Sequence, residues 1–485
     1  MGFLSFFTGA KTQVAAKKTA QRMFRAPRAD HLKGGFVPRN SWERVPSALG
    51  TIQARARDLV DNNPYASRAI SILSSYIVGS GIRIAVTGNP EYSAEFRDWA
   101  NSTAVDYDGR LNLYGKQNLA VRMMMGAGEA FEIIRHVEDA KGRVRPQFQS
   151  IDPSLVANTA MPKYPGNVVV AGVEISRQDG RVIGYHFYES ADPMMSGTKT
   201  FFVAARDVMH LFETLYPGQL RGVPRGSQAL IPADDVDNFV STMLVKARTE
   251  ACLTVFVKTA AGDEYADVGE VDETVSDPIP EDLRPGAIIR MGEGDEIQSI
   301  NPSSSGGFLD YIKVSLQAVA ISYRVTYSLL SGDLANVSFS SLKSDRDLFF
   351  QGCQETREIW VFPFVSRMER LFREDYELTT GEDVRVQTTI VPPARAQIDP
   401  QKETAAQIAR MQSGLTSWSD EVLASGKDPA EHLEQIIAER KAIGNSKIFF
   451  SFIPPVIEAD PEEEAEEQAE KDADANRDPA EDDEA

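Results

Sequence analysis

Cysteine is scarce in this chain of 485 residues, which contains only Cys252 and Cys353. Both lie in apolar patterns of helical or nearly helical spacing, so we expect buried, reduced thiols. Two cysteines suggest neither a disulfide framework nor a metal site. Histidine is also sparse, with five residues in the whole chain. His136, His186 and His210 lie on or beside predicted strands, and we interpret them as structural because none has a second histidine nearby in sequence.

Long apolar runs are missing as well. No segment reaches the roughly 18 apolar residues that a membrane-spanning helix requires. The apolar residues 1–7 lack the charged start and the cleavage site of a secretory signal, and Phe6 stands where a myristoylation motif needs Ser or Thr. We therefore expect no membrane partner.

Motifs that carry chemistry are also absent. The sequence has no Gly-x-x-x-x-Gly-Lys-Ser/Thr phosphate loop, no Gly-x-Ser-x-Gly, no His-Glu-x-x-His and no Cys pair at zinc spacing. The acidic runs at 462–467 and 482–484 are a poor basis for a nuclease, because two-metal catalysis needs carboxylates held rigidly on separate elements. We predict no catalytic residue, no cofactor and no metal.

The charge is strongly negative and unevenly placed. The formal net charge is −20; residues 1–36 hold seven Lys or Arg and one Asp, whereas residues 456–485 hold fifteen Asp or Glu and two Lys or Arg. An acidic chain is not expected to grip DNA, because phosphate binding draws on Lys and Arg. We expect a mobile basic arm at 1–45 and a disordered tail at 456–485, which has no apolar face to bury.

Apolar periodicity divides the remaining chain into blocks. It predicts helices at about 51–60, 65–78, 90–101 and 112–125, and a strand at 82–86. Between 129 and 212 the period changes to two, which predicts strands at 131–134, 168–175, 182–188 and 200–203, with a hairpin turn at Asp179-Gly180. Another strand is expected at 384–391, followed by three helices that end at Gly414, Gly426 and Gly444. The first and the third of these helices begin with Asp-Pro signals at 399 and 428. Glu431, three residues after Asp428, indicates a capping box.

The segment 306–374 has the pattern of two helices joined by a polar loop. One helix is predicted over 308–330, and a second begins near Ser340 and continues through Pro363, which should kink it by removing a backbone hydrogen bond. The loop between them carries no Lys or Arg, and its composition gives it little reason to be buried. It comprises Ser331, Gly332, Asp333, Leu334, Ala335, Asn336, Val337, Ser338, Phe339, Ser340 and Ser341.

A further helix is predicted at about 232–249, with Pro232 in its first turn. Its apolar stripe and that of the helix at 308–330 are our candidate packing residues. They are Val236, Phe239, Val240, Met243 and Leu244 in the first helix and Phe308, Ile312, Leu316, Val319 and Tyr323 in the second.

Four motifs, in this order along the chain, resemble the portal proteins of lambda-like tailed phages. They are Asp58-Leu-Val-Asp-Asn-Asn-Pro-Tyr-Ala66 with Ile77-Val-Gly-Ser-Gly-Ile82; Gln219-Leu-Arg-Gly-Val-Pro224; Asn336-Val-Ser-Phe-Ser-Ser341 with Arg346; and Pro392-Pro-Ala-Arg-Ala-Gln-Ile-Asp-Pro-Gln-Lys-Glu403. The resemblance covers about residues 40–440.

The resemblance implies an α+β portal fold with a mixed α/β wing, a two-helix stem, a small β-containing clip, a long kinked helix and a helical crown. Its parts would be the N-terminal arm at 1–45, the wing at 46–224, the first stem helix at 225–252, the clip at 253–305, the second stem helix at 306–330, the tunnel loop at 331–341, the long helix and wing return strand at 342–397, the crown at 398–455 and the acidic tail at 456–485.

Such proteins form rings, of twelve subunits in this family, through which DNA enters and leaves the head. The resemblance therefore implies a non-enzymatic ring at one capsid vertex of the virion, assembled in the host cytoplasm. Its partners would be copies of itself, double-stranded DNA without sequence specificity, the terminase large subunit, the major capsid or scaffold protein and a head-completion or neck protein. Two alternatives remain open: a terminase or nuclease of the same packaging system, and a monomeric scaffold or adaptor.

Overall fold

The computed structural model describes residues 48–139, 141–158, 160–189, 199–251, 255–259, 295–299, 308–335, 338–395 and 399–444. The chain divides into two compact units, Met1–Gly426 and Lys427–Ala485. In the second unit the described element is helix α13 (Pro429–Gly444). The mixture of helices and sheets confirms the expected α+β class.

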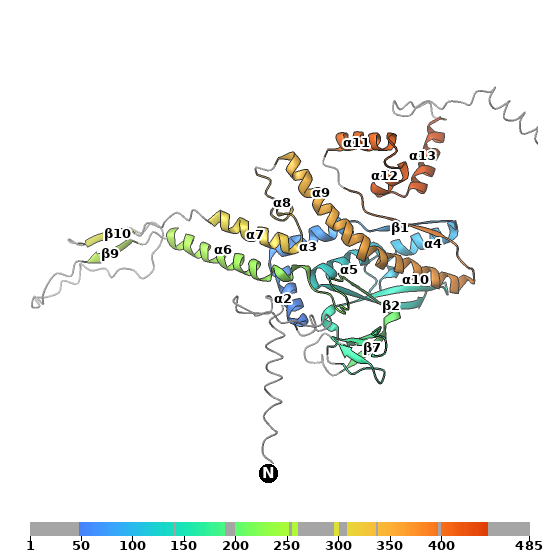
Figure 1. Ribbon diagram of the computed structural model, residues 1–485, viewed down its shortest axis with the longest axis horizontal. Helices are drawn as coiled ribbons and strands as arrows, with labels where there is room; N and C mark the ends of the chain where they lie inside the picture. The colour runs from blue at the N-terminus through green and yellow to red at the C-terminus, as the bar shows by residue number, and fades with distance from the viewer. Residues whose placement is uncertain are drawn as a thin grey trace, which may run out of the picture. The chain divides into compact units, whose positions relative to one another are not determined.

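The helices of the first unit come mostly before β2 and after β8, with the strands β2 to β8 following one another between them (Figure 1). They are α2 (Leu49–Asn62), α3 (Pro64–Ile77), α4 (Pro90–Asn101), α5 (Leu113–Ala127), α6 (Leu230–Ala251), α7 (Phe308–Tyr323), α8 (Tyr327–Ser331), α9 (Phe339–Thr356), α10 (Phe362–Thr380), α11 (Pro400–Gln412) and α12 (Trp418–Ala424). None of the described helices is both long and apolar enough to cross a membrane.

The described strands form four antiparallel sheets. The first sheet pairs β1 (Arg83–Thr87) with β11 (Gln387–Val391), and the second pairs β9 (Val255–Thr259) with β10 (Asp295–Ser299). The third has the order β3 (Val144–Ile151), β2 (Glu129–Glu138), β8 (Val208–Phe212). The fourth has the order β4 (Val168–Val170), β5 (Val173–Ile175), β6 (Val182–Tyr188), β7 (Thr200–Ala204).

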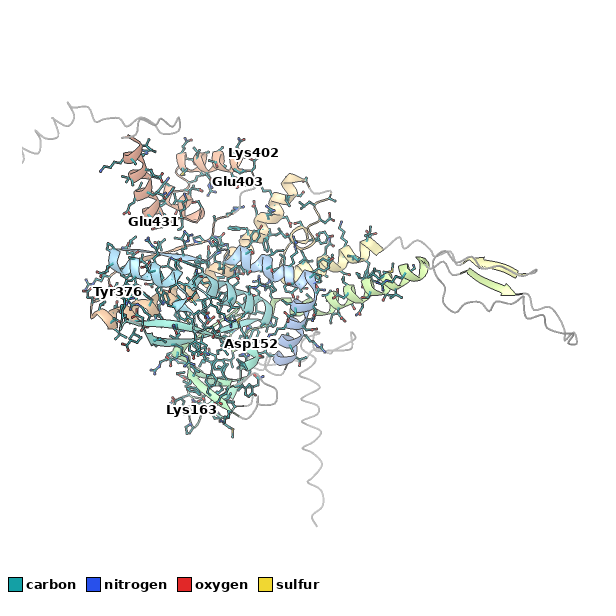
Figure 2. All side chains as sticks on the ribbon, turned by 180° about the vertical axis from the view of Figure 1, so that it is seen from behind. Asp152, Lys163, Tyr376, Lys402, Glu403 and Glu431 are labelled. Atoms are coloured by element: carbon teal, nitrogen blue, oxygen red, sulfur yellow. The ribbon has the colours of Figure 1, made fainter. Side chains whose placement is uncertain are left out.

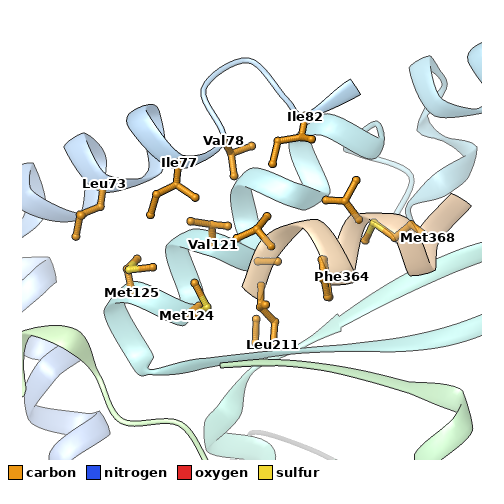
Figure 3. Close-up of a cluster of buried hydrophobic side chains, with 14 of the residues drawn as sticks. Leu73, Ile77, Val78, Ile82, Val121, Met124, Met125, Leu211, Phe364 and Met368 are labelled. Atoms are coloured by element: carbon orange, nitrogen blue, oxygen red, sulfur yellow. The ribbon is translucent and has the colours of Figure 1, made fainter. Parts of the chain in front are cut away.

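The main core gathers side chains from elements far apart in sequence. Figure 3 shows Leu73 and Ile77 of α3 facing Val121 and Met124 of α5, with Phe364 of α10 to their right. These side chains are nearly inaccessible to water, and burying each contributes about 1.5–3 kcal/mol to the free energy of unfolding. A second cluster joins the two larger sheets and consists of Phe131, Ile133, Ile151, Val156, Val173, Tyr185, Phe187 and Val208.

Local caps explain where several helices begin. Asn63 accepts hydrogen bonds from the backbone N–H groups of Tyr65 and Ala66 at the start of α3, and its side-chain N–H donates to Asp237 of α6 at 2.9 Å. Asp399 caps α11, as predicted. Asp428 accepts from the N–H of Glu431, but the capping box of this region joins Ser417 and Asp420 at the start of α12.

Two sequence-based expectations for strands are corrected by the structure. The predicted single strand at 168–175 is a hairpin of β4 and β5, because Ala171 and Gly172 both have positive φ angles of 51° and 81°. The strand expected at 384–391 begins only at Gln387. Strands β3 and β8 were not predicted as separate elements, and β3 contains Pro146.

The expected irregularity near Pro363 takes the form of a π-helical turn. Residues Arg357–Val361 lie between α9 and α10, and the N–H of Phe362 donates to the carbonyl of Arg357, five residues earlier. A proline at position 363 has no N–H to donate, so a widened turn just before it accommodates the missing bond.

The clip expected at 253–305 falls mostly outside the described residues. Within it the structure describes the paired strands β9 and β10. Cys252 lies outside the described residues, as do the arm expected at 1–45 and the tail expected at 456–485. Cys353 is buried in α9, and burial raises the pKa of its thiol to about 11.

Candidate functional site

The polar loop predicted at 331–341 is exposed from Gly332 onward wherever the structure describes it. Helix α8 ends at the half-buried Ser331, and Gly332 follows in the left-handed conformation that glycine adopts readily, with φ 73°. Residues Gly332 to Ala335 are exposed, including the side chain of Leu334 at 56%. Asn336 and Val337 lie outside the described residues, as does the side chain of Phe339. The described part of the loop is thus not packed inside its own subunit.

Short hydrogen bonds shape the loop locally. The N–H of Asp333 donates to Ser331 Oγ at 3.1 Å, and the N–H of Ala335 donates to Asp333 Oδ1 at 2.9 Å. At the far end Ser338 caps α9 by accepting from the N–H of Ser341. Helix α9 therefore begins at Phe339, so the last three predicted loop residues, 339–341, form its first turn.

The base of the loop is tied to the body of the subunit at two points. Arg68 of α3 donates from Nε to the carbonyl of Leu329 at 2.9 Å. The hydroxyl of Ser328 donates to Asp345 Oδ2 of α9 at 2.7 Å. Helix α8 is consequently held between α3 and α9, and it fixes the point from which the loop departs.

The predicted helix at 308–330 is two helices, which corrects the sequence-based expectation. Helix α7 ends at Tyr323, and Arg324 adopts a positive φ of 56°. The N–H of Val325 then donates to the carbonyl of Ala320 at 2.9 Å, the closing bond of a Schellman-type C-terminus. Arg324 occupies the left-handed position where glycine is usual, so the sequence contains no residue type that predicts the break between α7 and α8.

Helices α6 and α7 lie side by side, and their contact uses part of the predicted apolar stripes (Figure 1). The rings of Phe239 and Tyr311 are 4.3 Å apart between centroids. The candidate residues differ in burial. Val236, Leu316, Val319 and Tyr323 are buried, Phe239, Val240, Met243 and Ile312 are half-buried, and Leu244 is 52% exposed. The side chain of Phe308 lies outside the described residues.

Helix α7 also carries a second apolar face, which is not among the stripes predicted from the sequence. Val314 is 63% exposed and Ile321 is 75% exposed, and their spacing of seven residues places them on the same side of the helix. Leu309 on α7 and Val245 on α6 are exposed as well, at 77% and 60%. Plotting every apolar residue of 308–323 on a helical wheel, rather than one stripe, reveals this face.

A buried carboxylate joins the sheet of β3, β2 and β8 to α2 and to the loop 219–224. Glu129 of β2 is fully buried and accepts from Arg221 Nε at 2.9 Å, from His210 Nε2 at 3.0 Å and from the N–H of Gly222 at 2.9 Å. Burial opposes its ionisation, but the Arg221 guanidinium and the hydrogen bond from His210 hold the pKa of Glu129 well below its ordinary value. Gln53 of α2 donates to the same carboxylate at 2.8 Å.

The contacts around the Glu129 carboxylate explain which residue types occur in the motif at 219–224. Gln219 donates to the carbonyl of Arg221, which aligns the segment, and Arg221 itself is the largest fully buried side chain among the described residues. A Cβ on Gly222 would lie 2.0 Å from the carbonyl oxygen of Gly128, so no larger residue fits there. The loop 219–224 is thus locked to β2.

A second buried cluster joins α5 to the same sheet. Lys116 Nζ lies 3.1 Å from Asp106 Oδ1 and 3.0 Å from Glu132 Oε2. Ser150 donates to Glu132 Oε1 at 2.7 Å. Burial raises the pKa of Glu132 above its ordinary value in spite of Lys116. All four side chains hold the helix against the sheet, so we interpret the cluster as structural.

Each histidine singled out in the sequence contacts a carboxylate. His210 contacts Glu129, His186 contacts Glu174 at 2.8 Å, and His136 contacts Asp375 at 2.8 Å. The partners are not the acidic residues that are nearest in sequence. Among the described residues no group of three or more His, Cys, Asp or Glu is placed to hold a metal ion.

Salt bridges join other distant parts of the first unit. Asp152, which follows β3 and is labelled in Figure 2, accepts from Arg57 of α2 at 2.6 Å. Arg395 in the motif at 392–403 pairs with Asp347 of α9 and lies over the ring of Phe350. The motifs identified in the sequence therefore act mainly by fixing one element against another.

Comparison with known proteins gives one family. A family model described as phage portal protein, lambda family, matches residues 34–357, which is more than half of the chain. The chain is 22% identical over 462 residues to portal protein B of Escherichia phage lambda, with 81% of this chain and 84% of that protein covered. It is 22% identical over 452 residues to the portal protein of Escherichia phage N15, with the same coverage, and 23% identical over 460 residues to a probable portal protein of Halomonas phage phiHAP-1, with 86% of each covered.

Comparison with solved structures gives matches of low TM-score and low identity. A chain from the neck of a native gene transfer agent particle has a TM-score of 0.47 and 12% identity, over 79% of this chain and 95% of that chain. An HK97-family phage portal protein from Corynebacterium diphtheriae has a TM-score of 0.32 and 11% identity, over 73% of this chain and 97% of that chain.

Proposed function

Because the chain belongs to the lambda family of phage portal proteins, we propose that its copies form a closed ring at one capsid vertex, with residues 331–341 lining the narrowest part of the channel. The ring carries double-stranded DNA into the head and out again, without sequence specificity. Its role is mechanical and not enzymatic, and the ring is part of the virion after assembly in the host cytoplasm.

The exposure of the loop supports this assignment most directly. A loop buried by its own subunit would be unavailable to DNA, whereas Gly332, Asp333, Leu334 and Ala335 are all exposed. The loop carries Asp333 as its one charged residue and no Lys or Arg. Because each phosphate that a cation neutralises adds affinity through counterion release, a loop without cations lets a duplex slide with little friction.

The second apolar face of α7 supports the ring. Val314 and Ile321 are exposed on the side of α7 opposite to its buried stripe. Exposed apolar side chains that recur on one helix face indicate an interaction surface. In a ring each subunit presents this face to a neighbour, which buries it; a heterologous contact of this kind closes when the rotation between copies is right.

The same proposal assigns the remaining parts of the chain. The wing comprises 46–224, the stem 225–252 and 306–330, the long helix and return strand 342–397, and the crown 398–455. The clip at 253–305 docks the terminase large subunit during packaging and a head-completion or neck protein afterwards. The major capsid or scaffold protein surrounds the ring at the vertex.

The experiment that tests the lumenal loop reverses its charge. We expect the double variant Asp333→Lys, Asn336→Lys to assemble into rings but to package or retain less DNA than the wild type, because two cations per subunit would hold phosphates. The matched control is Gln178→Lys, Asp179→Lys, which makes the same charge change in the exposed hairpin between β5 and β6. Equal packaging by the loop variant and the control would remove residues 331–341 from the lumen.

A further inference from the structure

We propose that Arg68 contacts DNA phosphates inside the channel, as one cation per subunit placed at the base of the tunnel loop. The inference rests on the proposed lumenal position of residues 331–341. It adds to that position a residue from α3, far from the loop in sequence, and it assigns a role to a side chain outside every motif identified in the sequence.

The structure places the Arg68 guanidinium beside the first residues of the loop. Its Nε donates to the carbonyl of Leu329, two residues before the end of α8. A Cβ built on Gly332 would lie 3.8 Å from Arg68 Nη2. One hydrogen bond thus orients the side chain, and a terminal nitrogen lies next to the start of the exposed loop.

Among the described residues, Arg68 forms no ion pair with a carboxylate, unlike the paired arginines of the same unit. Arg57 pairs with Asp152, Arg225 with Glu213 and Arg395 with Asp347. None of the ion pairs between described residues includes Arg68, whose side chain is exposed at the surface. The nearby carboxylate of Asp333 accepts from the N–H of Ala335 in its own turn.

An exposed guanidinium held at Nε leaves its two terminal nitrogens for a ligand. Their planar N–H groups match the oxygens of a phosphate, and arginine is the residue best suited to such contacts. Phosphate is the anion that a DNA channel brings past this point. In a ring, the Arg68 side chains would form a circle of cations next to an otherwise uncharged or acidic constriction.

The contact between Arg68 and a phosphate would attract the duplex at one level of the channel. A loop free of cations lets DNA slide, whereas a single cation per subunit at its base adds a weak, salt-dependent grip that opposes slippage. The competing role is purely structural: Arg68 would only tie α3 to α8 through the carbonyl of Leu329. Two substitutions separate these roles, because Arg68→Lys keeps the charge and Arg68→Gln removes it but keeps an N–H donor.

The test measures binding of linear double-stranded DNA by purified full-length rings as a function of NaCl concentration. We expect Arg68→Gln to flatten the plot of log affinity against log salt by about 0.9 for each phosphate that the ring no longer neutralises. Arg68→Lys should keep most of the wild-type slope. The control Arg206→Gln removes a cation whose side chain is 87% exposed on the wing and should leave the slope unchanged.

The Asp333→Lys ring is measured alongside, and ring assembly of each variant is checked by electron microscopy. If Asp333→Lys steepens the slope while Arg68→Gln leaves it at the wild-type value, the loop faces DNA but Arg68 does not. If neither variant changes the slope, the lumenal position of the loop fails and the role of Arg68 fails with it. If Arg68→Gln and Arg68→Lys lower the slope equally, Arg68 only ties α3 to α8 through the carbonyl of Leu329, and the proposed phosphate contact is wrong.

Discussion

At the scale of single residues, the wing depends on a few buried charges that serve several elements at once. The carboxylate of Glu129 accepts hydrogen bonds from side chains of α2, β8 and the loop 219–224. Breaking a buried ion pair by removing one partner costs about 3–5 kcal/mol, because the remaining charge is left uncompensated. Glu129 and Arg221 are 92 residues apart, so the residue pattern does not predict that they pair. The motif at 219–224 could therefore be identified in the sequence, but not its contact with Glu129.

The histidine of this cluster predicts a pH dependence. Burial lowers the pKa of His210 below its ordinary value of 6.5, although Glu129 acts in the opposite sense. The unfolded chain therefore binds a proton more readily than the folded one, and the contribution of His210 to the free energy of unfolding is complete above about pH 6.5 and falls as the pH decreases below it.

We expect the wild type to lose more stability between pH 7.5 and pH 5.5 than His210→Gln does, because protonation of His210 favours the unfolded chain. Thermal unfolding of the two proteins at a series of pH values measures the difference directly. Parallel profiles for wild type and variant would show that His210 does not titrate with unfolding.

Glycine 222 gives a steric prediction at the same scale. Its missing side chain allows the loop 219–224 to approach the carbonyl of Gly128, so Gly222→Ala should destabilise the wing by several kcal/mol or prevent folding. Gly352 is the matched control, because a Cβ there would meet nothing within 4 Å in the middle of α9. Gly352→Ala should instead stabilise by roughly 0.5–1 kcal/mol. Denaturant unfolding of both variants tests the pair, and equal effects would contradict it.

At the scale of elements, the sequence is most informative where apolar periodicity and caps agree. Helix α4 has the predicted limits, and α3 begins at Pro64 behind its Asn63 cap. The break between α7 and α8 escaped prediction because the apolar pattern continues through it and Arg324, not a glycine, takes the positive φ. Such a break depends on tertiary packing around Val325 and Leu330, which are buried in the main core.

The exposed apolar face of α7 leads to a prediction about ring assembly. Replacing Val314 and Ile321 together by Glu adds charge to a face that is exposed in the single subunit, so the fold should survive while ring assembly is abolished. The control variant carries Glu at Leu215 and Leu378, which are 56% and 80% exposed and are not part of α7. Sedimentation of both proteins gives the oligomeric state; intact rings in the α7 variant would show that this face is not between subunits.

At the scale of the whole molecule, the resemblance to portal proteins predicted the family and the ring, whereas the residue pattern predicted only helices, strands and loops. The sequence contains neither a phosphate-loop motif nor an apolar run long enough to span a membrane, and the order of four motifs pointed to the portal family, which the family match confirms. Periodicity alone suggested a helix, a loop and a helix, but neither a channel nor a ring. The positions of the loop and of α7 in an assembly depend on contacts between copies, which no single sequence displays.

The acidic C-terminus gives a prediction for the assembled protein. Removing residues 456–485 deletes fifteen Asp or Glu and few apolar side chains, so the ring should assemble as before. Negative-stain images of the truncated and full-length proteins provide the comparison. Disappearance of rings on truncation would assign the tail a part in assembly.

The most direct test of the central claim is a cryo-electron microscopy reconstruction of the purified full-length protein. The account predicts an annular particle whose central hole admits a DNA duplex, with residues 331–341 of every subunit at its narrowest point and the face of Val314 and Ile321 against the neighbouring subunit. Monomers, or rings in which these residues lie on the outer wall, would contradict it.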